Sequence, residues 1–325
     1  MKAVVVEDYD RIENITIRDV AKPELLPGMV RVRIQAAAVG FVDGLKVQGL
    51  YQTKDALPFT PGSEFAGVVD EAAPGVEGFV PGTSVIGMVR NGGLAEYLCA
   101  RPTDLFLTPD GIEPATGASF FANYLTALYA LSARGKLRSG ETLLVLGAAG
   151  GVGIAAVQVG KLLGARVIAA ASTEEKRQFA IRFGADAVLD YTREGWREDL
   201  NVLTNDHGAD LIYDPVGGEL SLQAFRSIAW NGRHLVIGFA SGSIPALKFN
   251  LPLLKGGALL GVDLAQIGRR EPEVRDRIIA QLFTWLSDKT LVPVVGRVFA
   301  FEDFREAFAA MTTRSALGKM VVRIS

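Results

Sequence analysis

Four glycines gather between residues 147 and 153, where a short apolar run gives way to a helical pattern. The run is "TLLVLG", and the pattern that follows is "GIAAVQVGKLLGA". Glycine adopts backbone angles that other residues resist, and without a side chain it lets a ligand approach the main-chain N–H groups. The first N–H groups of a helix are unpaired and carry a partial positive charge, so they bind anions. This stretch therefore predicts a pyrophosphate site at the start of a helix.

The spacing of Gly147, Gly150 and Gly153 is G-x-x-G-x-x-G, a variant of the G-x-G-x-x-G fingerprint of dinucleotide-binding folds. That fingerprint is informative when it follows a strand and opens a helix, as the pattern predicts here. The alternative is a glycine-rich turn that serves packing alone. We favour the dinucleotide site, because alternating strands and helices continue along the chain after this turn.

The residues after the next predicted strand bear on which dinucleotide is bound. A site that prefers NAD usually has an acidic residue there, bonded to the ribose 2′-OH. The strand "RVIAAA" is followed instead by Ser172 and Thr173, and then by Glu174, Glu175 and Lys176. The hydroxyl of Ser172 and the ammonium of Lys176 would suit a 2′-phosphate, which favours NADP(H). The two glutamates also suit the positive end of a helix, and Lys176 also fits a solvated surface position.

The elements that must position these residues change character near residue 115. The first third contains short strand candidates separated by Gly and Pro, and apolar and polar residues alternate strictly in residues 29–37. Residues 114–135 have helical spacing. From residue 142 onward, short apolar runs alternate with amphipathic helices, which predicts a parallel sheet covered on both faces. The strands expected in this second part are 142–147, 166–171, 187–191, 209–214 and 232–239, with an edge strand at 257–263. The helices expected are 152–164, 174–183, one that runs to about 205, 219–229, 273–289 and 301–311, and a strand at 318–324 closes the chain.

The composition excludes several classes of function. The chain has 325 residues and a formal net charge of -2, so it has no basic field to attract nucleic acid. The sequence contains no uninterrupted apolar run of about 18 residues, so we expect no membrane-spanning helix. The single cysteine, Cys99, cannot form an internal disulfide, which predicts a cytoplasmic protein. Cys99, His207 and His234 stand at no ligand spacing, so we expect no metal site, and both histidines are expected to be structural.

Taken together, these motifs resemble the zinc-free quinone oxidoreductase (zeta-crystallin-like) branch of the medium-chain dehydrogenase/reductase superfamily, over nearly the full length. The resemblance rests on "GLYQTKDALPFTPGSEFAGVV", "GAAGGVGIAAVQVGKLLGA", "ASTEEK", "FGADAVLDY", "DPVGG" and "RSALGKMVV". It implies an α/β fold with a GroES-like, β-rich catalytic domain, residues 1–122 and 262–325, and a Rossmann NADP-binding domain with a doubly wound parallel sheet, residues 123–261. It also implies an active site in a cleft between the domains, and a homodimer joined through the edge strand at 257–263.

The resemblance further implies a set of NADPH contacts. Gly150, Gly151 and Val152 would meet the pyrophosphate, and Ser172, Lys176 and Tyr191 would surround the 2′-phosphate. The remaining contacts would come from Thr126 near the nicotinamide ribose, Gly238 and Phe239 beside the nicotinamide, and Arg314 from the C-terminal tail. Tyr191 also fits a half-buried aromatic at a strand end, and Arg314 also fits a surface arginine.

Three positions depart from patterns found in the superfamily. Its zinc-dependent members have a catalytic Cys where this chain has Val39, and a His where it has Ser63. The quinone reductase branch often has Asn-x-x-Asp, of which this chain keeps Asp43 but has Gly40 in place of the Asn. Because the missing amide could bond the nicotinamide or the substrate, this departure bears on the substrate class more than on cofactor binding.

The chemistry expected is hydride transfer without a metal. Quinones and conjugated enones suit such a site, because both accept a hydride to give an anion that needs only modest stabilisation. Tyr51 is the candidate phenol for a hydrogen bond to the substrate oxygen, although it also fits a core or rim tyrosine. Asp43 would orient its neighbours or cap a helix. We therefore predict an NADPH-dependent reductase of a small quinone or enone; the alternatives are a non-catalytic NADPH-binding protein with a structural or regulatory role, and an enoyl-thioester reductase.

Overall fold

The computed structural model describes residues 1–313 and 315–325, which divide into two compact units. The first unit contains residues 1–122 and 286–325, and the second contains residues 123–285. Residues 262–285 thus group with the second unit, although the sequence analysis placed them in the first domain. Glu271 is one residue that ties this segment to the second unit, because its Oε1 accepts a hydrogen bond from the Tyr129 hydroxyl at 3.2 Å and lies 3.9 Å from Nη1 of Arg134.

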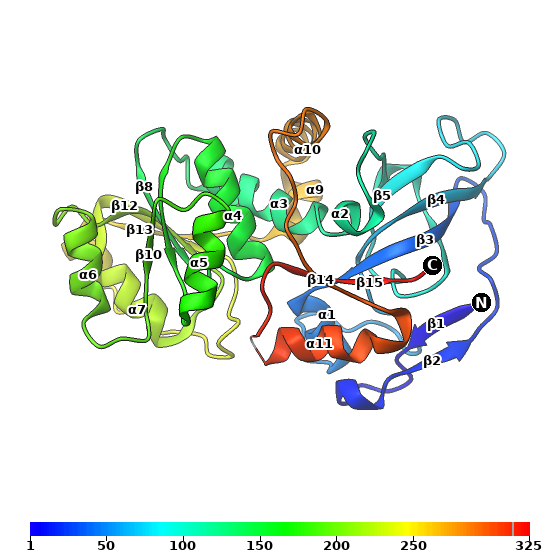
Figure 1. Cartoon of the computed structure of the whole chain (residues 1–325), viewed down its shortest axis with the longest axis horizontal. Coiled ribbons are helices and arrows are strands. Elements are labelled where there is room, and N and C mark those ends of the chain that lie inside the picture. The colour runs from blue at the N-terminus through cyan, green and yellow to red at the C-terminus, as the bar shows by residue number, and fades with distance from the viewer. Residues whose placement is uncertain (314) are drawn as a thin grey trace. The chain divides into compact units, whose positions relative to one another are not determined.

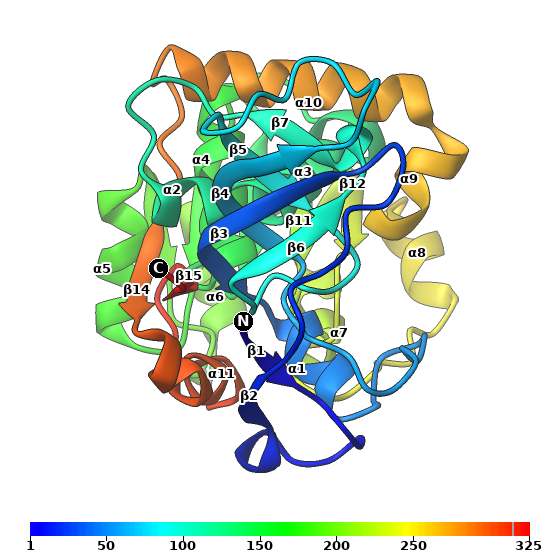
Figure 2. The same cartoon turned by 90° about the vertical axis from the view of Figure 1, so that its right-hand side faces the viewer.

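A mostly antiparallel sheet of seven strands forms the first unit (Figure 2). Its strand order is β14-β15-β3-β4-β5-β7, with β6 paired to β3. The bounds are β3 Val30–Val39, β4 Glu64–Ala72, β5 Ser84–Met88, β6 Tyr97–Ala100, β7 Leu105–Leu107, β14 Val295–Phe299 and β15 Lys319–Arg323, and a separate pair is formed by β1 Lys2–Val5 and β2 Thr16–Asp19. Because β15 pairs with β3, the C-terminal strand completes the β-rich unit, as the resemblance implied.

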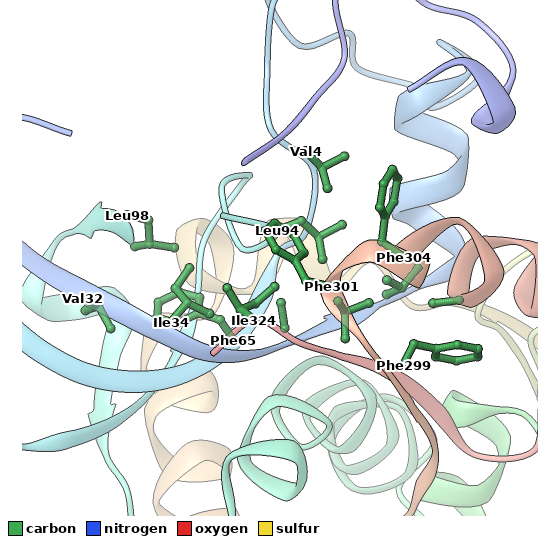
Figure 3. Close-up of a cluster of buried hydrophobic side chains, with 14 of the residues drawn as sticks. Val4, Val32, Ile34, Phe65, Leu94, Leu98, Phe299, Phe301, Phe304 and Ile324 are labelled. Atoms are coloured by element: carbon green, nitrogen blue, oxygen red, sulfur yellow. The ribbon is translucent and has the colours of Figure 1, made fainter. Parts of the chain in front are cut away.

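The alternation in β3 shows how the sequence builds the core of this unit. Val30, Val32 and Ile34 are fully buried, whereas the intervening polar side chains are only partly so. Figure 3 shows Val32 and Ile34 in the cluster together with Phe65 of β4 and Phe304. One face of the sheet is therefore closed by apolar side chains from both ends of the chain.

Short helices complete the first unit. They are α1 Phe41–Val47, α2 Pro114–Ala118 and α11 Phe304–Thr312, with 3-10 turns η1 Ile12–Asn14, η2 Pro102–Asp104 and η4 Phe301–Asp303. The sequence analysis did not foresee α1, because seven residues that include Gly44 give too short and too weak a periodic signal. The strands β7 and β14 were not predicted either.

The second unit is built on a six-stranded parallel sheet. Its order is β10-β9-β8-β11-β12-β13, so the strands numbered from β8 run 3-2-1-4-5-6, which is the doubly wound arrangement that the family resemblance implied. The strands are β8 Thr142–Leu146, β9 Arg166–Ala170, β10 Ala187–Leu189, β11 Ala209–Asp214, β12 Ile228–Val236 and β13 Ala258–Gly261. Helices α4 and α5 cover one face and α6 and α7 the other (Figure 1), as right-handed crossovers require.

The predicted helices of this unit appear in the expected order with small shifts at their ends. The helices are α3 Phe121–Leu128, the π-helical segment η3 Tyr129–Arg134, α4 Gly151–Leu162, α5 Glu174–Arg182, α6 Trp196–Leu203, α7 Gly218–Arg226, α8 Asn250–Lys255, α9 Leu264–Arg270 and α10 Pro272–Ser287. Of these, α8 and α9 are two short helices that the sequence analysis did not predict. The single helix expected at 114–135 is instead α2, α3 and η3. The break follows α2, where the Ser119 hydroxyl donates to the carbonyl oxygen of Thr116 at 2.9 Å. No helix within the described part of the chain is long and apolar enough to cross a membrane.

Candidate functional site

The glycine-rich turn joins β8 to α4, and its glycines have different reasons to be there. Gly147 has φ +61°, in the left-handed region that favours glycine. A Cβ on Gly153 would lie 2.3 Å from the carbonyl oxygen of Gly147, so the helix can approach the turn only without a side chain there. A Cβ on Gly150 would have its nearest neighbour, the same oxygen, at 3.6 Å. The fold itself therefore requires Gly147 and Gly153, whereas the space beside Gly150 is open.

The first main-chain N–H groups of α4 are not capped by any side chain of the described residues. Gly150 is the N-cap, and its carbonyl accepts the N–H of Ile154 at 2.8 Å, as in a regular first turn. The N–H groups of Gly151 and Val152 precede that bond and carry the positive end of the helix dipole. Open space beside Gly150 and uncapped donors next to it fit the pyrophosphate of a dinucleotide.

This turn lies where the strand order of the sheet reverses. The connection after β8 leads to β9 on one side, and the neighbour of β8 on the other side is β11. The turn and the loop after β11 are in contact, since a Cβ on Gly147 would lie 3.0 Å from Cγ2 of Val216. In open parallel sheets, ligands bind outside the carboxyl ends of the strands at such a reversal.

Asp214, the last residue of β11, anchors the loop on that side. Its Oδ1 accepts the N–H groups of Val216 at 2.9 Å and Gly217 at 3.0 Å. Its Oδ2 accepts the Ser221 hydroxyl and lies 2.9 Å from Nε2 of His234. Burial alone would raise the pKa of Asp214, but the hydrogen bonds from His234, Ser221 and Gly217 outweigh burial and lower it. His234 thus has the structural role expected, as a partner of the loop anchor.

Gly238 and Phe239 follow β12 and are tied to the same loop. The N–H of Ile237 donates to the carbonyl oxygen of Asp214 at 2.9 Å, and the N–H of Ala240 donates to that of Pro215 at 3.0 Å. A Cβ on Gly217 would lie 2.9 Å from Cδ1 of Phe239. The loops after β11 and β12 are therefore packed together, with Gly238 and Phe239 between these bonds.

The residues expected around the 2′-phosphate lie where β9 and β10 end. Ser172 follows β9, and Thr173 caps α5 by accepting the N–H of Lys176 at 3.3 Å. Tyr191 follows β10. Ser172, Lys176 and Tyr191 are all half-buried. Two neighbouring strands of the sheet thus bring these three residues to its carboxyl edge.

Thr126 and Arg314 complete the expected cofactor contacts. Thr126 is half-buried in α3, and that helix is tied to α4 by the Tyr124 hydroxyl, 2.5 Å from Oε1 of Gln158. Arg314 lies outside the described residues. The second unit therefore carries every described residue that the sequence proposed for the cofactor.

The two candidate catalytic residues belong to the first unit. Asp43 lies in α1 and is 2% exposed; its Oδ2 accepts the N–H of Gly40 at 2.8 Å, and its Oδ1 has no hydrogen-bond partner in the described chain. Burial raises the pKa of Asp43, against the opposing effect of Lys319 and Lys46. Tyr51 is half-buried in the bend that follows α1.

The structure also gives a physical account of the glycine at position 40. A Cβ there would lie 3.3 Å from Oδ2 of Asp43 and 3.4 Å from Nζ of Lys319, so a larger side chain would crowd the Asp43 carboxyl group and the Lys319 ammonium. Lys319 is 2.5 Å from Oε2 of Glu64, whose Oε1 accepts the N–H of Ala122 at 2.6 Å. This buried ion pair was missed by the sequence analysis, because its members are 255 residues apart. The described residues contain no group of three or more His, Cys, Asp and Glu side chains that could hold a metal ion.

Comparisons with known proteins agree with this architecture. The profile of the alcohol dehydrogenase GroES-like domain matches residues 26–110, and that of the zinc-binding dehydrogenase family matches residues 151–280. Quinone oxidoreductase-like protein 2 of Bos taurus is 34% identical over 95% of this chain and 89% of the relative, and the quinone oxidoreductase of Homo sapiens is 28% identical over 99% and 97%. The structure of the quinone oxidoreductase from Thermus thermophilus, also solved in complex with NADPH, superposes with a TM-score of 0.86 at 34% identity over 99% of this chain and 100% of that one.

Proposed function

The chain belongs to the zinc-free quinone oxidoreductase branch of the medium-chain dehydrogenase/reductase superfamily, and from this premise we propose that it is an NADPH-dependent reductase of a quinone or conjugated enone. The observation that carries the proposal is the open, uncapped start of α4 at the strand-order reversal, with Ser172 in place of an acid after β9. The Thermus thermophilus relative was solved with NADPH, which supports the same cofactor here.

Three groups of residues in the second unit would hold NADPH, which supplies the hydride when bound. Gly150, Gly151 and Val152 would bind the pyrophosphate through their main-chain groups. Ser172, Lys176 and Tyr191 would bind the 2′-phosphate, and Thr126, Gly238 and Phe239 would orient the nicotinamide end, with Arg314 as a further contact. The Asp214 network would keep the loops after β11 and β12 in place, and a fixed site of this kind orients the reactants before reaction.

In the first unit, Tyr51 would donate a hydrogen bond to the acceptor oxygen, where negative charge develops during reduction. Asp43 would act as a positioning residue, because its raised pKa favours the uncharged acid and its Oδ2 is used by Gly40 at the start of α1. The opposite charges of its neighbours Lys319 and Glu64 would offset each other, so the net charge of the three side chains would stay close to zero.

The test is a substrate panel. Purified protein should oxidise NADPH in the presence of 1,4-benzoquinone, 9,10-phenanthrenequinone or a conjugated enone, and the Gly150→Val variant should not exceed the rate without protein. Tight NADPH binding with no turnover on any acceptor would favour the non-catalytic alternative. Faster reduction of an enoyl thioester than of any quinone would favour the enoyl-thioester reductase.

We further propose a cytoplasmic homodimer. The single cysteine agrees with a reducing compartment. The dimer would form through β13, which is an edge strand of the parallel sheet and lies beside exposed apolar side chains. These side chains are Trp230, Phe249, Leu253, Leu254 and Leu259, and they are called the β13 apolar face below.

A further inference from the structure

Arg177 joins the turns that follow β9 and β10. Its side chain is 13% exposed, and Nη1 donates to the carbonyl oxygen of Ala171 at 3.2 Å. Nη1 also lies 2.9 Å from Oδ2 of Asp190, while Nε and Nη2 donate to Oε2 of Glu174 at 3.1 and 2.9 Å. Four of the five guanidinium N–H groups are therefore directed at the protein itself. Arg177 is a link inside the structure, and its position does not suit it to be the main ligand of an anion.

These contacts lie among the residues proposed for the 2′-phosphate. The N–H of Ala171 donates to the carbonyl oxygen of Leu189 at 3.0 Å, which sets the ends of β9 and β10 side by side. Ser172 comes directly after Ala171, and Tyr191 comes two residues after Leu189. Charged side chains in these two turns would therefore attract or repel a 2′-phosphate bound between Ser172 and Tyr191.

Two of the groups that Arg177 contacts are carboxylates. Hydrogen bonds from Gln178 and Arg177 lower the pKa of Glu174. Burial would raise the pKa of Asp190, but the bonds from Thr192 and Arg177 outweigh burial and lower it. Both groups are therefore anionic at neutral pH, and an unbalanced pair of carboxylates would repel a 2′-phosphate.

We infer that Arg177 determines cofactor specificity indirectly, by balancing Glu174 and Asp190 and fixing the Ala171 turn so that the site accepts a 2′-phosphate. The inference rests on the proposed function, because it concerns the same NADPH site. Without the guanidinium, Glu174 and Asp190 would leave two uncompensated negative charges in the turns that hold Ser172 and Tyr191. These charges would disfavour the 2′-phosphate of NADPH and would act much less on NADH, which lacks that phosphate. The loss of Arg177 should thus shift the preference from NADPH toward NADH.

The experiment measures Kd for NADPH and NADH by fluorescence titration of the full-length protein. Arg177→Ala should weaken NADPH binding at least tenfold, a loss of about 1.4 kcal/mol or more in its binding free energy, and should change NADH binding by less than about threefold. The loss should shrink as salt is raised, since screening weakens repulsion between charges near the surface. Arg182→Ala is the matched control, because Arg182 is an exposed arginine of the same helix, stacked on Phe179, and should leave both constants unchanged.

A rescue experiment separates charge balance from mere packing. Adding Glu174→Gln to Arg177→Ala removes one of the unbalanced carboxylates and should restore at least threefold of the lost NADPH affinity. Arg177→Lys keeps the charge but not the planar fork, and should retain more of the preference than Arg177→Ala.

The outcomes distinguish the two proposals. If the unaltered protein binds NADPH no better than NADH, the proposed function is wrong and this inference falls with it. If the unaltered protein prefers NADPH but Arg177→Ala loses both cofactors equally, or if Glu174→Gln restores nothing, the inference is wrong while the proposed function stands.

Discussion

Two kinds of glycine occupy the turn between β8 and α4, and they should respond differently to substitution. Gly150 has φ -75°, which any residue adopts, and open space beside it. Gly150→Val should therefore leave the thermal midpoint within a few degrees and abolish measurable NADPH binding, because the side chain would fill the space of the pyrophosphate. Thermal unfolding and fluorescence titration of the same sample check both halves.

Gly153→Ala should show the reverse order of effects. Its Cβ would lie 2.3 Å from the Gly147 carbonyl oxygen, so the turn or the helix must shift, at a cost of about 3 kcal/mol in the free energy of unfolding. Urea denaturation measures that cost. Equal stability losses in the two variants, or unchanged NADPH affinity in Gly150→Val, would contradict the assignment of Gly150 to the ligand.

Lys176 gives the most direct single-residue test of the phosphate site. Removal of its ammonium by Lys176→Ala should weaken NADPH by about tenfold, the scale of a charge-assisted hydrogen bond of 1.5–3 kcal/mol, roughly. NADH lacks the 2′-phosphate, so its Kd should change by less than about twofold. Glu175→Gln, on the adjacent exposed residue, serves as the control and should not weaken NADPH. Equal losses for both cofactors would refute the role of Lys176.

At the scale of elements, Asp214 connects β11 and α7 to the loop of Val216 and Gly217. Asp214→Asn removes an ionised acceptor from a buried network, and should lower the free energy of unfolding at pH 7 by about 2–3 kcal/mol. The NADPH Kd should rise as well, because the loops of Gly238 and Phe239 depend on the same anchor.

The pH dependence of this effect has a defined sign. The folded state lowers the pKa of Asp214 below its ordinary value of 3.8, so the carboxylate stabilises the fold above that value. Its contribution should shrink as the pH falls below 3.8 toward the lowered pKa of the folded state. Urea midpoints of the unaltered protein and of Asp214→Asn should converge over that range; a gap that widens there would mean that the group does not titrate as stated.

Local signals account for what the sequence predicted of these elements. The alternation of β3 and the strand-turn-helix pattern around Gly150 depend on neighbouring residues, and both elements were located to within one or two residues. The contacts of Arg177 with Asp190, of Asp214 with His234 and of Glu64 with Lys319 depend on strand register or on distant segments. No periodicity reports such pairs, so the network around the candidate site became visible only in the folded chain.

At the scale of the whole molecule, the β13 apolar face is the feature that an isolated chain leaves unexplained. Phe249 is 93% exposed and Leu253 is 78% exposed, four residues apart at the start of α8. Trp230 packs against Gly256, where a Cβ would lie 3.1 Å from the indole, so β12, α8 and β13 form one continuous surface. An edge strand flanked by exposed apolar side chains is a surface that a second copy can cover, by pairing strand with strand about a two-fold axis.

A dimer built in this way should depend on those side chains and not on exposed apolar residues elsewhere in the second unit. We expect sedimentation to give twice the chain mass for the unaltered protein, and the mass of one chain for Phe249→Glu combined with Leu253→Glu, since buried carboxylates without partners disfavour association. Val202→Glu is the control, because Val202 is 77% exposed on α6, which packs beside β10 at the opposite edge of the sheet. If the Val202→Glu variant dissociates as readily, the interface lies at the β10 edge of the sheet. If the unaltered protein sediments as one chain at micromolar concentration, no second copy covers the β13 apolar face and the proposed dimer is wrong.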